Sequence, residues 1–407
     1  MREVSPEGSA WVKAWTPAEG RDRAASLLLE ELGVDATCHW SAAGRATLIG
    51  EHTDYNAGLS LATVTPHRAY VAAAPRDDDV VRVTSGLGDV LEGPGRVWEG
   101  RVGEAPGPDL GWPAYPAGIV WAMHERGFSG RGMDIAIESC LPPQGGLASS
   151  AAVLGATVLA VNDLWRLALD GDDGRSELAD ACLDAENAMA GVMCGPLDPH
   201  VALRCGADEA LLLDFSGRTV SATHYPMYIR DYGLGLLVVD TQVPHGDVRP
   251  LFESRRAECA AAAHALGAAD LREIADSPQA LRRVESLEDP IARRRARHVV
   301  SEIERVRLVA AELGGTAPAH ERFVSIGKAI FRSHASLDVD YEASRPSLDL
   351  AVDAAFRAGA LGARVSGAGG GGSVIALVRK AQAESTATQI ADAFTAEGRL
   401  APRFLWI

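Results

Sequence analysis

The chain has 407 residues, of which 47% are hydrophobic and 23% charged, and a formal net charge of −16 at pH 7. This length exceeds what one hydrophobic core usually serves, so we expect two globular domains. The negative charge argues against a nucleic-acid partner, whose phosphates such a surface would repel. A nucleotide can still bind locally, through backbone amides and a metal ion.

The sequence predicts a cytoplasmic protein with no membrane partner. No basic segment followed by an apolar run opens the chain, and no stretch approaches the roughly 18 to 20 apolar residues that span a bilayer. The cysteines lack the spacing of a zinc site, and they are typical of buried or incidental thiols in a reducing compartment. They are Cys38, Cys140, Cys182, Cys194, Cys205 and Cys259.

The first half of the chain predicts an α/β domain. Residues 1–20 are mixed in character, and we expect them to form a loosely held extension. From residue 21 to 216, short apolar runs alternate with helical patterns. The expected strands cover residues 64–75, 78–85 and 206–215, and the expected helices cover residues 112–128 and 150–169.

Residues 217–407 form the second expected domain. The arginine cluster at residues 293–297 could indicate a polyanion site, but nearby acidic residues balance it, and we interpret it as a solvated helix face. The expected elements are a strand at 232–240, helices within 251–313, a helix at 347–363, a glycine loop at 364–373, a strand at 374–378 and a helix at 383–398.

Polar side chains crowd a turn at residues 44–56, between two apolar segments. Glu51, His52 and Asp54 offer donors and acceptors that suit a polyhydroxylated ligand. An exposed acidic loop is the structural alternative. The density of polar groups favours a binding site.

A glycine turn at residues 141–152 runs into the most apolar of the expected helices. Gly145 and Gly146 let backbone amides converge, and the helix start adds unpaired amides and the positive end of a dipole, which together suit a phosphate. Ser149 and Ser150 could cap the helix or bind a metal, and a plain serine-capped helix is the alternative. No Gly-x-x-x-x-Gly-Lys-[Ser/Thr] sequence occurs, so a P-loop is not expected.

Two further features of the sequence are candidates for a functional role. The glycines of residues 366–372 lie between a helix and a strand, where they permit close backbone approach to a ligand or another loop. A flexible linker would be unusual between two apolar elements.

Glu186 precedes Asp198 by twelve residues. These two carboxylates could serve a metal and accept a proton, although acidic residues are common on surfaces.

Taken together, these segments resemble the GHMP kinase superfamily and, within it, the galactokinase family. Residues 44–58 are similar to the galactokinase signature almost position for position, and the resemblance spans roughly residues 24–405. The other similar segments are residues 141–153 (the nucleotide-phosphate motif), 362–378 (the third superfamily motif), 238–245, 252–259 and 333–349.

The resemblance implies a two-domain α/β (α+β) fold. A ribosomal-S5-like amino-terminal domain and a ferredoxin-like carboxy-terminal domain would flank the active site. It also implies a kinase that uses ATP and Mg²⁺ to phosphorylate the anomeric hydroxyl of galactose or a galactose-like sugar. We expect a monomer or a weak homodimer.

The resemblance also implies roles for individual residues. Asp198 matches the catalytic aspartate of the family and Arg45 its partnering arginine. The other implied positions are the sugar contacts Glu51, His52, Asp54 and Gly195; the ATP contacts Gln144, Gly145, Gly146, Leu147, Ala148, Ser149, Ser150, Ala151, Gly369 and Gly370; and the Mg²⁺ ligands Ser150 and Glu186.

The sequence departs from the family pattern mainly on the sugar side. Pro199 replaces the usual glutamine after the aspartate, so Asp198 could be an N-cap with Pro199 as the first helical residue. Phe252 replaces a tyrosine that contacts the sugar, which should weaken discrimination by hydrogen bonding. The remaining departures are Pro244 for lysine, an added Arg249, Gly371 for phenylalanine and, with less consequence, Ala148 for serine.

Two alternatives remain open at this point. One is an anomeric kinase for a modified or chain-extended galacto-sugar such as an octose, with Arg249 facing an anionic substituent. The other is a sensor that binds sugar and ATP without turnover. Such sensors lose residues from the phosphate loop, whereas Ser149, Ser150 and Asp198 are present here. An enzyme is therefore favoured.

Overall fold

The computed structural model describes residues 10–88, 93–143, 145–190, 194–243 and 249–407, and its strands form two sheets. The larger sheet is centred on β2, which has 17 residues. Strand β1 pairs along one edge of β2, while β5 and β6 pair in succession along the other. The strands are β1 Cys38–Ile49, β2 Leu59–Pro75, β3 Val80–Ser85, β4 Val97–Arg101, β5 Met133–Ser139, β6 Glu209–Asp214 and β7 Ser221–Pro226.

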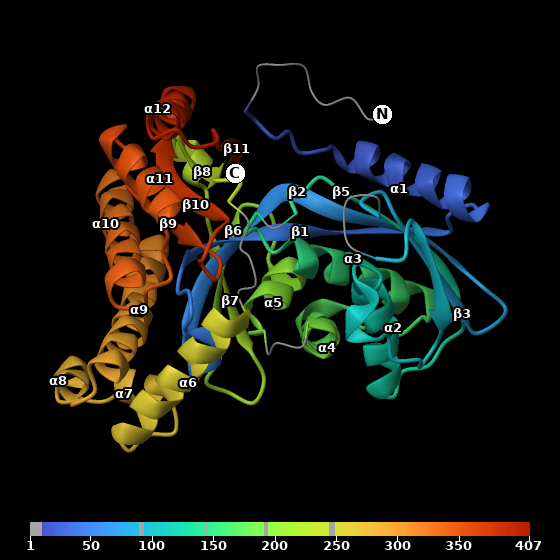
Figure 1. Cartoon of the computed structure of the whole chain (residues 1–407), viewed down its shortest axis with the longest axis horizontal. Coiled ribbons are helices and arrows are strands. Elements are labelled where there is room, and N and C mark those ends of the chain that lie inside the picture. Colours follow the sequence, from blue (N-terminus) through green and yellow to red (C-terminus); the bar gives the residue numbers. More distant parts are fainter. Residues whose placement is uncertain (1–9, 89–92, 144, 191–193, 244–248) are drawn as a thin grey trace.

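Helices cover both faces of the larger sheet (Figure 1). Helix α1 (Pro17–Leu32) packs its apolar residues against Tyr70, Ala72 and Ala74 of β2. The alternate residues Val71 and Ala73 point to the main core, as the two-residue repeat of a strand requires. Four helices cover that other face: α2 Ala114–Glu125, α3 Ser149–Leu164, α4 Gly171–Ala190 and α5 Leu197–Arg204.

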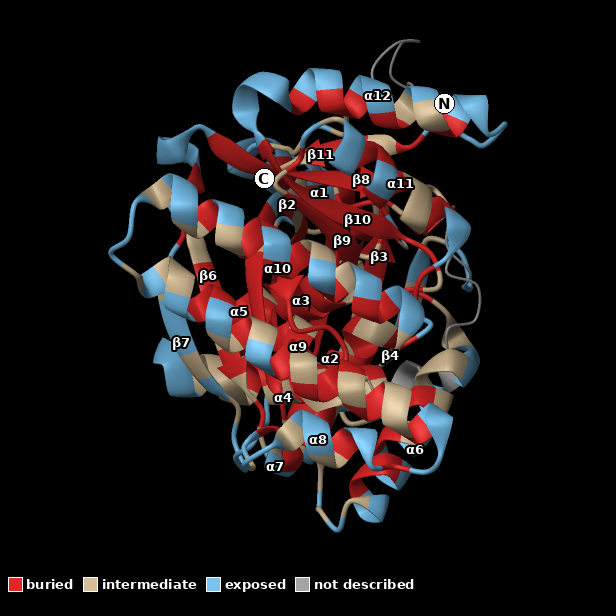
Figure 2. Ribbon diagram, turned by 90° about the vertical axis from the view of Figure 1, so that its left-hand side faces the viewer, coloured by how far each residue is buried: buried red, intermediate tan, exposed pale blue. Residues whose placement is uncertain are grey.

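The smaller sheet is antiparallel, in the order β11-β8-β10-β9. All seven residues of β8 are buried, as its continuous apolar run predicts. Helix α10 packs against β9, and buried and exposed residues alternate in bands along α9 and α10 (Figure 2). The strands are β8 Leu234–Asp240, β9 Gly362–Ser366, β10 Ser373–Arg379 and β11 Arg403–Trp406.

Most of the remaining helices follow β8. None of the helices in the described part of the chain is long and apolar enough to cross a membrane. The α-helices are α6 Arg249–Ala265, α7 Leu271–Ala275, α8 Ala280–Glu285, α9 Pro290–Gly314, α10 Ala319–Val339, α11 Pro346–Arg357 and α12 Ala383–Ala396. The short 3-10 helices are η1 Asp54–Asn56, η2 Pro108–Leu110, η3 Ile229–Tyr232 and η4 Lys380–Gln382.

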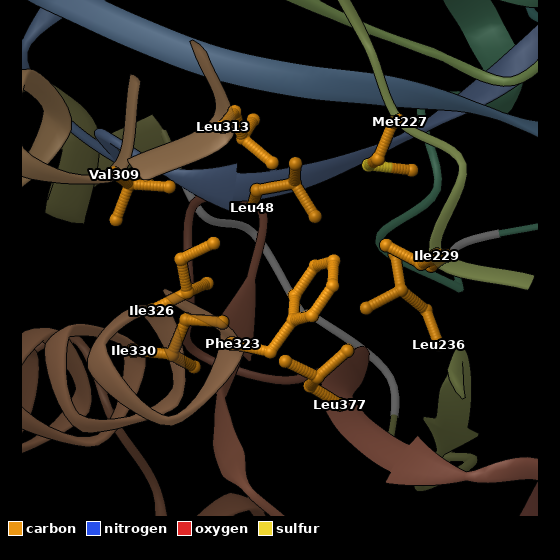
Figure 3. Close-up of a pocket in the computed structure, with 10 residues that line it drawn as sticks. All are labelled: Leu48, Met227, Ile229, Leu236, Val309, Leu313, Phe323, Ile326, Ile330 and Leu377. Atoms are coloured by element: carbon orange, nitrogen blue, oxygen red, sulfur yellow. The ribbon is translucent and has the colours of Figure 1, made fainter. Parts of the chain in front are cut away.

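An apolar pocket lies where the two sheets meet (Figure 3). Leu48 of β1 faces Leu236 of β8 and Leu377 of β10 across it, and side chains from α9 and α10 close it. Burial of this surface holds the two sheets together without directional bonds. The other lining residues are Met227, Ile229, Val309, Leu313, Phe323, Ile326 and Ile330.

The structure corrects the interpretation of residues 293–297 as a solvated helix face. Arg295 is only 2% exposed. Its Nε lies 2.5 Å from Oε2 of Glu258, and its Nη2 lies 2.5 Å from Oε2 of Glu342. Arg297 forms a further pair with Glu285. These arginines therefore hold the helical layer together, a role that charge counting along the sequence does not predict.

Two observations bear on the predicted domain boundaries at residues 20/21 and 216/217. Helix α1 begins at Pro17, and Trp11 forms a β-bridge with Phe404, so the described part of residues 1–20 is attached to the fold. Strand β7 follows residue 216 but pairs with β6 in the larger sheet, and the smaller sheet begins with β8. The boundaries themselves stay a prediction.

Close packing of α10 on the loop before β9 can be tested with a glycine substitution. A Cβ at Gly327 would lie 2.1 Å from the carbonyl oxygen of Leu361, which is backbone and cannot rotate away. We expect Gly327→Ala to lower the free energy of unfolding by about 1–3 kcal/mol through overpacking. Gly107→Ala is the control, because a Cβ there meets no atom within 4 Å. The measurement is urea unfolding monitored by circular dichroism. Equal urea midpoints for the two variants would contradict the packing described here.

Candidate active site

An ion pair with a buried arginine joins the polar turn at residues 44–56 to Asp198. Arg45 lies on β1, next to a shift in the register with β2, and Asp198 lies in the first turn of α5. Nε and Nη2 of Arg45 each lie 2.7 Å from Oδ1 of Asp198. The Arg45 side chain is 6% exposed and that of Asp198 is 28% exposed. The carboxylate is therefore accessible to a ligand while its partner is enclosed.

Helix α5 differs from the sequence prediction at its start. Pro196 is the N-cap, so Asp198 is the second helical residue and Pro199 the third. Proline fits at this position because the amides of the first helical turn have no partner within the helix. The position also brings the Asp198 carboxylate near the positive end of the helix dipole.

The environment of the pair makes Asp198 more basic than a free aspartate. Burial raises the pKa of Asp198, Arg45 lowers it and Glu51 raises it, with a net upward direction. Burial opposes the charge of Arg45, but Asp198 and Glu51 hold its pKa above the ordinary value. An ionised, basic carboxylate beside a permanent cation is suited to accept a proton from a hydroxyl group.

Arg45 also binds the glycine turn at residues 141–152. Its backbone amide donates to the carbonyl of Leu147 at 2.9 Å, and its Nη1 donates to the carbonyl of Gly146 at 3.0 Å. Gly146 and Ala148 have φ values of 68° and 55°, in the left-handed region, and α3 begins at Ser149. No side chain caps this helix. Its first amides are therefore free of intrahelical partners and are suited to an anion such as a phosphate.

Two oxygen-bearing side chains lie beside this loop. Oγ of Ser150, on α3, donates to Oε1 of Glu186, on α4, at 2.7 Å. Burial raises the pKa of Glu186 to about 7. A hydroxyl and a carboxylate fit Mg²⁺, which usually takes its remaining ligands from water and substrate phosphates. The described residues contain no group of three or more His, Cys, Asp or Glu that could hold a metal ion.

The polar turn after β1 brings three predicted sugar contacts together. Oε1 of Glu51 accepts the Gly367 amide at 2.6 Å and lies 3.3 Å from Nη2 of Arg364. Burial alone would raise the pKa of Glu51, but Arg45 and Arg364 hold it below the ordinary value. Burial raises the pKa of Asp54 to about 6. A Cβ at Gly195 would lie 1.6 Å from Oδ2 of Asp54, so these residues are in direct contact and a larger residue at position 195 would displace the Asp54 carboxylate.

His52 lies between these carboxylates but uses both of its ring nitrogens within the protein. Nδ1 lies 2.9 Å from the Tyr55 hydroxyl, and Nε2 lies 3.1 Å from the Ala368 carbonyl oxygen. Its backbone φ of 64° is in the left-handed region. Phe252 packs on this pair, with ring centroids 5.8 Å from His52 and 5.2 Å from Tyr55. In this arrangement neither ring nitrogen of His52 is free for a sugar hydroxyl.

The two ends of the glycine loop at residues 366–373 contact the glycine turn at Gly145 and Gly146. Oγ of Ser373 donates to the Gly145 carbonyl, and a Cβ at Gly146 would lie 2.9 Å from the Ser366 carbonyl oxygen. Gly369 and Gly370 lie against the loop after α10, and their assignment to ATP stays a prediction. The Gly370 amide donates to the Ala343 carbonyl at 2.9 Å, and a Cβ at Gly369 would lie 2.2 Å from that same oxygen.

Several named positions fall outside the described residues. Gln144 and Pro244 are not described, and Arg249 is described only as the first residue of α6, without its side chain. Sequence reasoning missed Arg364 and Glu302, two buried charges behind the polar turn. A charged residue inside the apolar run of β9 was the available signal for Arg364.

Comparisons with known proteins agree with this architecture. The galactokinase galactose-binding signature matches residues 29–75, and the GHMP kinase N-terminal and C-terminal domains match residues 114–206 and 316–398. The crystal structure of Lactococcus lactis galactokinase complexed with galactose superimposes with a TM-score of 0.81 at 25% identity, covering 95% of this chain and 97% of that one. Methanococcus jannaschii mevalonate kinase matches with a TM-score of 0.62 at 17% identity, covering 91% and 97%. The fold and matched domains define a GHMP kinase.

Proteins similar in sequence show which family of GHMP kinases the chain belongs to. Streptomyces coelicolor galactokinase is 41% identical over 379 residues, which cover 92% of this chain and 93% of that protein. Mycobacterium tuberculosis galactokinase is 36% identical over 363 residues, covering 89% and 94%. The chain belongs to the galactokinase family. The fold and the family that the sequence predicted are both confirmed.

The raised pKa of Glu186 gives a prediction about stability. The unfolded chain loses this proton near pH 4.5 and the folded protein near pH 7. The buried carboxylate therefore destabilises the fold progressively as pH rises through this window. Glu186→Gln, which keeps an acceptor for Ser150, should unfold with a free energy higher by up to about 3 kcal/mol at about pH 8.

Two controls accompany this comparison: a measurement at low pH and a substitution at an exposed glutamate. At about pH 4 the carboxyl is protonated in both states, so the difference between Glu186→Gln and wild type should vanish. Glu104→Gln, at an exposed position, should change stability at neither pH. Urea unfolding at the two pH values measures both. A gain in stability that is equal at both pH values would show that ionisation of Glu186 is not its cause.

Proposed function

We propose that the protein transfers the γ-phosphate of ATP to the anomeric hydroxyl of galactose. The proposal is carried by Arg45, whose side chain bonds both the Asp198 carboxylate and the carbonyl of Gly146. One enclosed guanidinium thus lies between a basic carboxylate and the loop that leads into the start of α3, whose first amides have no partner within the helix. Phosphoryl transfer depends on such alignment and on charge neutralisation more than on covalent help from the protein.

In the proposed reaction Asp198 receives the proton of the galactose O1 hydroxyl. Arg45 bonds only Oδ1 of Asp198 among the described contacts, and Oδ2 has no partner within the described residues. The hydroxyl would approach that second oxygen. Arg45 stays charged and would stabilise negative charge that builds up on the transferring phosphoryl group. Glu51, Asp54 and Gly195 would contact the remaining sugar hydroxyls.

ATP would bind at the residues 145–151, where the start of α3 leaves its amides unpaired. Ser150 and Glu186 would hold Mg²⁺, which neutralises triphosphate charge when bound. Because Glu186 has a pKa of about 7 in the free protein, metal binding would have to displace its proton. Ser150, which now donates to Glu186, would turn its oxygen lone pairs to the ion.

Galactose is the substrate that the family relatives favour over a chain-extended or modified sugar. The relatives matched over most of their length are galactokinases. The Ser149-Ser150 pair and Asp198 are in place for turnover, which argues against a sensor. We also propose a cytoplasmic location, consistent with six free cysteines, and a monomer or weak homodimer.

The first test removes the proposed base. Asp198→Asn should lower kcat for galactose by about a hundred- to ten-thousand-fold, because an amide cannot accept the proton. The dissociation constant for Mg-ATP should stay within about twofold, since the carboxylate does not bind the amide loop itself. Asp173→Asn, an exposed aspartate on α4, is the matched control. A variant that retains a fifth or more of wild-type kcat would remove Asp198 from this role.

A second test concerns the sugar side. Phe252→Tyr restores a hydroxyl beside His52 and Tyr55, and it should increase the ratio of kcat/KM for galactose over its epimers, by about tenfold for one added hydrogen bond. The measurement is a sugar panel with Mg-ATP, with the position of the phosphate read by ³¹P NMR. Phe356→Tyr, at a side chain 64% exposed, should leave the ratio unchanged. An unaltered ranking in Phe252→Tyr would exclude this side chain from sugar selection.

A further inference from the structure

A continuous chain of hydrogen bonds runs behind the polar turn. The Tyr55 hydroxyl lies 2.9 Å from Nδ1 of His52 and 2.7 Å from the Tyr341 hydroxyl. The Tyr341 hydroxyl in turn lies 3.2 Å from Sγ of Cys259. At the other end, Nε2 of His52 lies 3.1 Å from the Ala368 carbonyl oxygen. We refer to Cys259, Tyr341, Tyr55 and His52 as the hydroxyl chain.

The direction of every bond in the hydroxyl chain follows from its last acceptor. A carbonyl oxygen can only accept, so Nε2 of His52 carries a proton and donates to Ala368. Burial lowers the pKa of His52 to about 4, so the ring is neutral near pH 7 and its Nδ1 is an acceptor. Tyr55 must then donate to His52 and accept from Tyr341. Tyr341 has no second hydrogen, so it accepts from the thiol of Cys259.

Three members of the hydroxyl chain are buried, Tyr55 is partly buried, and the four connect separate parts of the fold. Tyr341 is 0% exposed, Cys259 1% and His52 4%. The Tyr341 ring lies 4.6 Å from the His52 ring and 4.5 Å from the His298 ring, centroid to centroid. Cys259 comes from α6, Tyr341 from the segment after α10, and Tyr55 from η1. Loss of a hydrogen bond to one of these buried groups costs free energy, because the group that remains stays buried without a partner.

We propose that Tyr55 and Tyr341 are positioning residues that hold the neutral, Nε2-protonated ring of His52 in place through its Nδ1 acceptor, and that His52 thereby ties the polar turn to the glycine loop of residues 366–372. The amide of Gly367, next to Ala368, bonds Glu51 at 2.6 Å, so two neighbouring bonds link these loops. Glu51 and Asp54 flank His52 in the sequence. Holding the ring therefore holds both carboxylates. The functional part of this inference rests on the proposed function, since it takes Glu51 and Asp54 as galactose contacts.

His52 thus has a structural role besides the sugar contact that the resemblance implies. Both of its ring nitrogens are engaged by Tyr55 and Ala368, so the ring acts as a bridge between loops. Phe252 lies against the His52 and Tyr55 rings.

The experiment compares full-length wild type, Tyr55→Phe, Tyr341→Phe and the control Tyr70→Phe. Tyr70 is a buried tyrosine whose hydroxyl bonds only the Trp15 carbonyl among the described residues, on the far face of the larger sheet. Long-range ¹H–¹⁵N spectra of histidine-labelled protein at pH 7 report the tautomer of each ring, and a His52→Gln sample assigns the His52 signals. Steady-state kinetics give KM for galactose and for ATP separately.

We expect His52 of wild type to be neutral and protonated at Nε2. Tyr55→Phe should keep the Nε2-protonated tautomer, because Ala368 still accepts from Nε2, but should shift the Nδ1 resonance towards that of a nitrogen without a hydrogen bond. It should also raise KM for galactose by about tenfold, as expected for one lost buried hydrogen bond, while KM for ATP stays unchanged. Tyr341→Phe should show a smaller effect in the same direction, and Tyr70→Phe should match wild type in both measurements.

Each contrary outcome has a distinct meaning. An Nδ1-protonated or charged His52 in wild type overturns the hydroxyl chain, even if no variant folds. An unchanged Nδ1 resonance, or equal increases in KM for galactose and ATP, in Tyr55→Phe overturns the positioning role. If wild type binds galactose but does not phosphorylate it, the proposed function fails while the tautomer assignment stands on its own spectrum.

Discussion

One buried guanidinium holds the candidate active site together. Arg45 donates through Nε and Nη2 to Asp198, through Nη1 to the carbonyl of Gly146, and through its backbone amide to Leu147. Its donors have a fixed planar geometry and its charge persists at every relevant pH. The spacing between the carboxylate on α5 and the loop before α3 is therefore set by one side chain on β1. A shorter cation could reach one partner but not all of them.

A second set of buried charges fixes the polar turn that follows β1. Glu302 of α9 accepts the Gly50 amide at 2.9 Å and Nε of Arg305 at 2.6 Å. Burial alone would raise the pKa of Glu302, but Arg305 and its other neighbours lower it to about 2. Buried ion pairs of this kind add little net stability, but removing one partner leaves an uncompensated charge, so the arrangement resists distortion. The carboxy-terminal helices thus hold a turn of the larger sheet in place.

The sequence predicted the parts of this protein that carry strong local patterns. The apolar runs of β8 and α3 and the three glycine motifs were found because burial and turn geometry restrict residue types there. Strand β1 was missed because Ser, Gly and Arg interrupt its alternation, and its pairing with β2 supplies the regularity that its sequence lacks. Strand β7 is mostly exposed and carries little pattern.

Contacts between segments that lie far apart in the sequence account for the features that could not be predicted from it. The burial of Arg295 depends on Glu258 and Glu342, which lie 37 and 47 residues away. The turn of Gly369 and Gly370 towards Ala343 and the engagement of both His52 nitrogens likewise arise from packing between loops. A motif identifies residues that meet, but the partner of each atom depends on the surrounding fold.

The most direct test of the central claim is a crystal structure with galactose, Mg²⁺ and a non-hydrolysable ATP analogue. The account predicts that the anomeric oxygen will lie within hydrogen-bond distance of the Asp198 carboxylate, with Arg45 still bonded to both Asp198 and Gly146. The analogue's phosphates should meet the amides at the start of α3, beside Ser150 and Glu186. A complex in which galactose is bound away from Asp198, or in which Arg45 bonds neither partner, would contradict it.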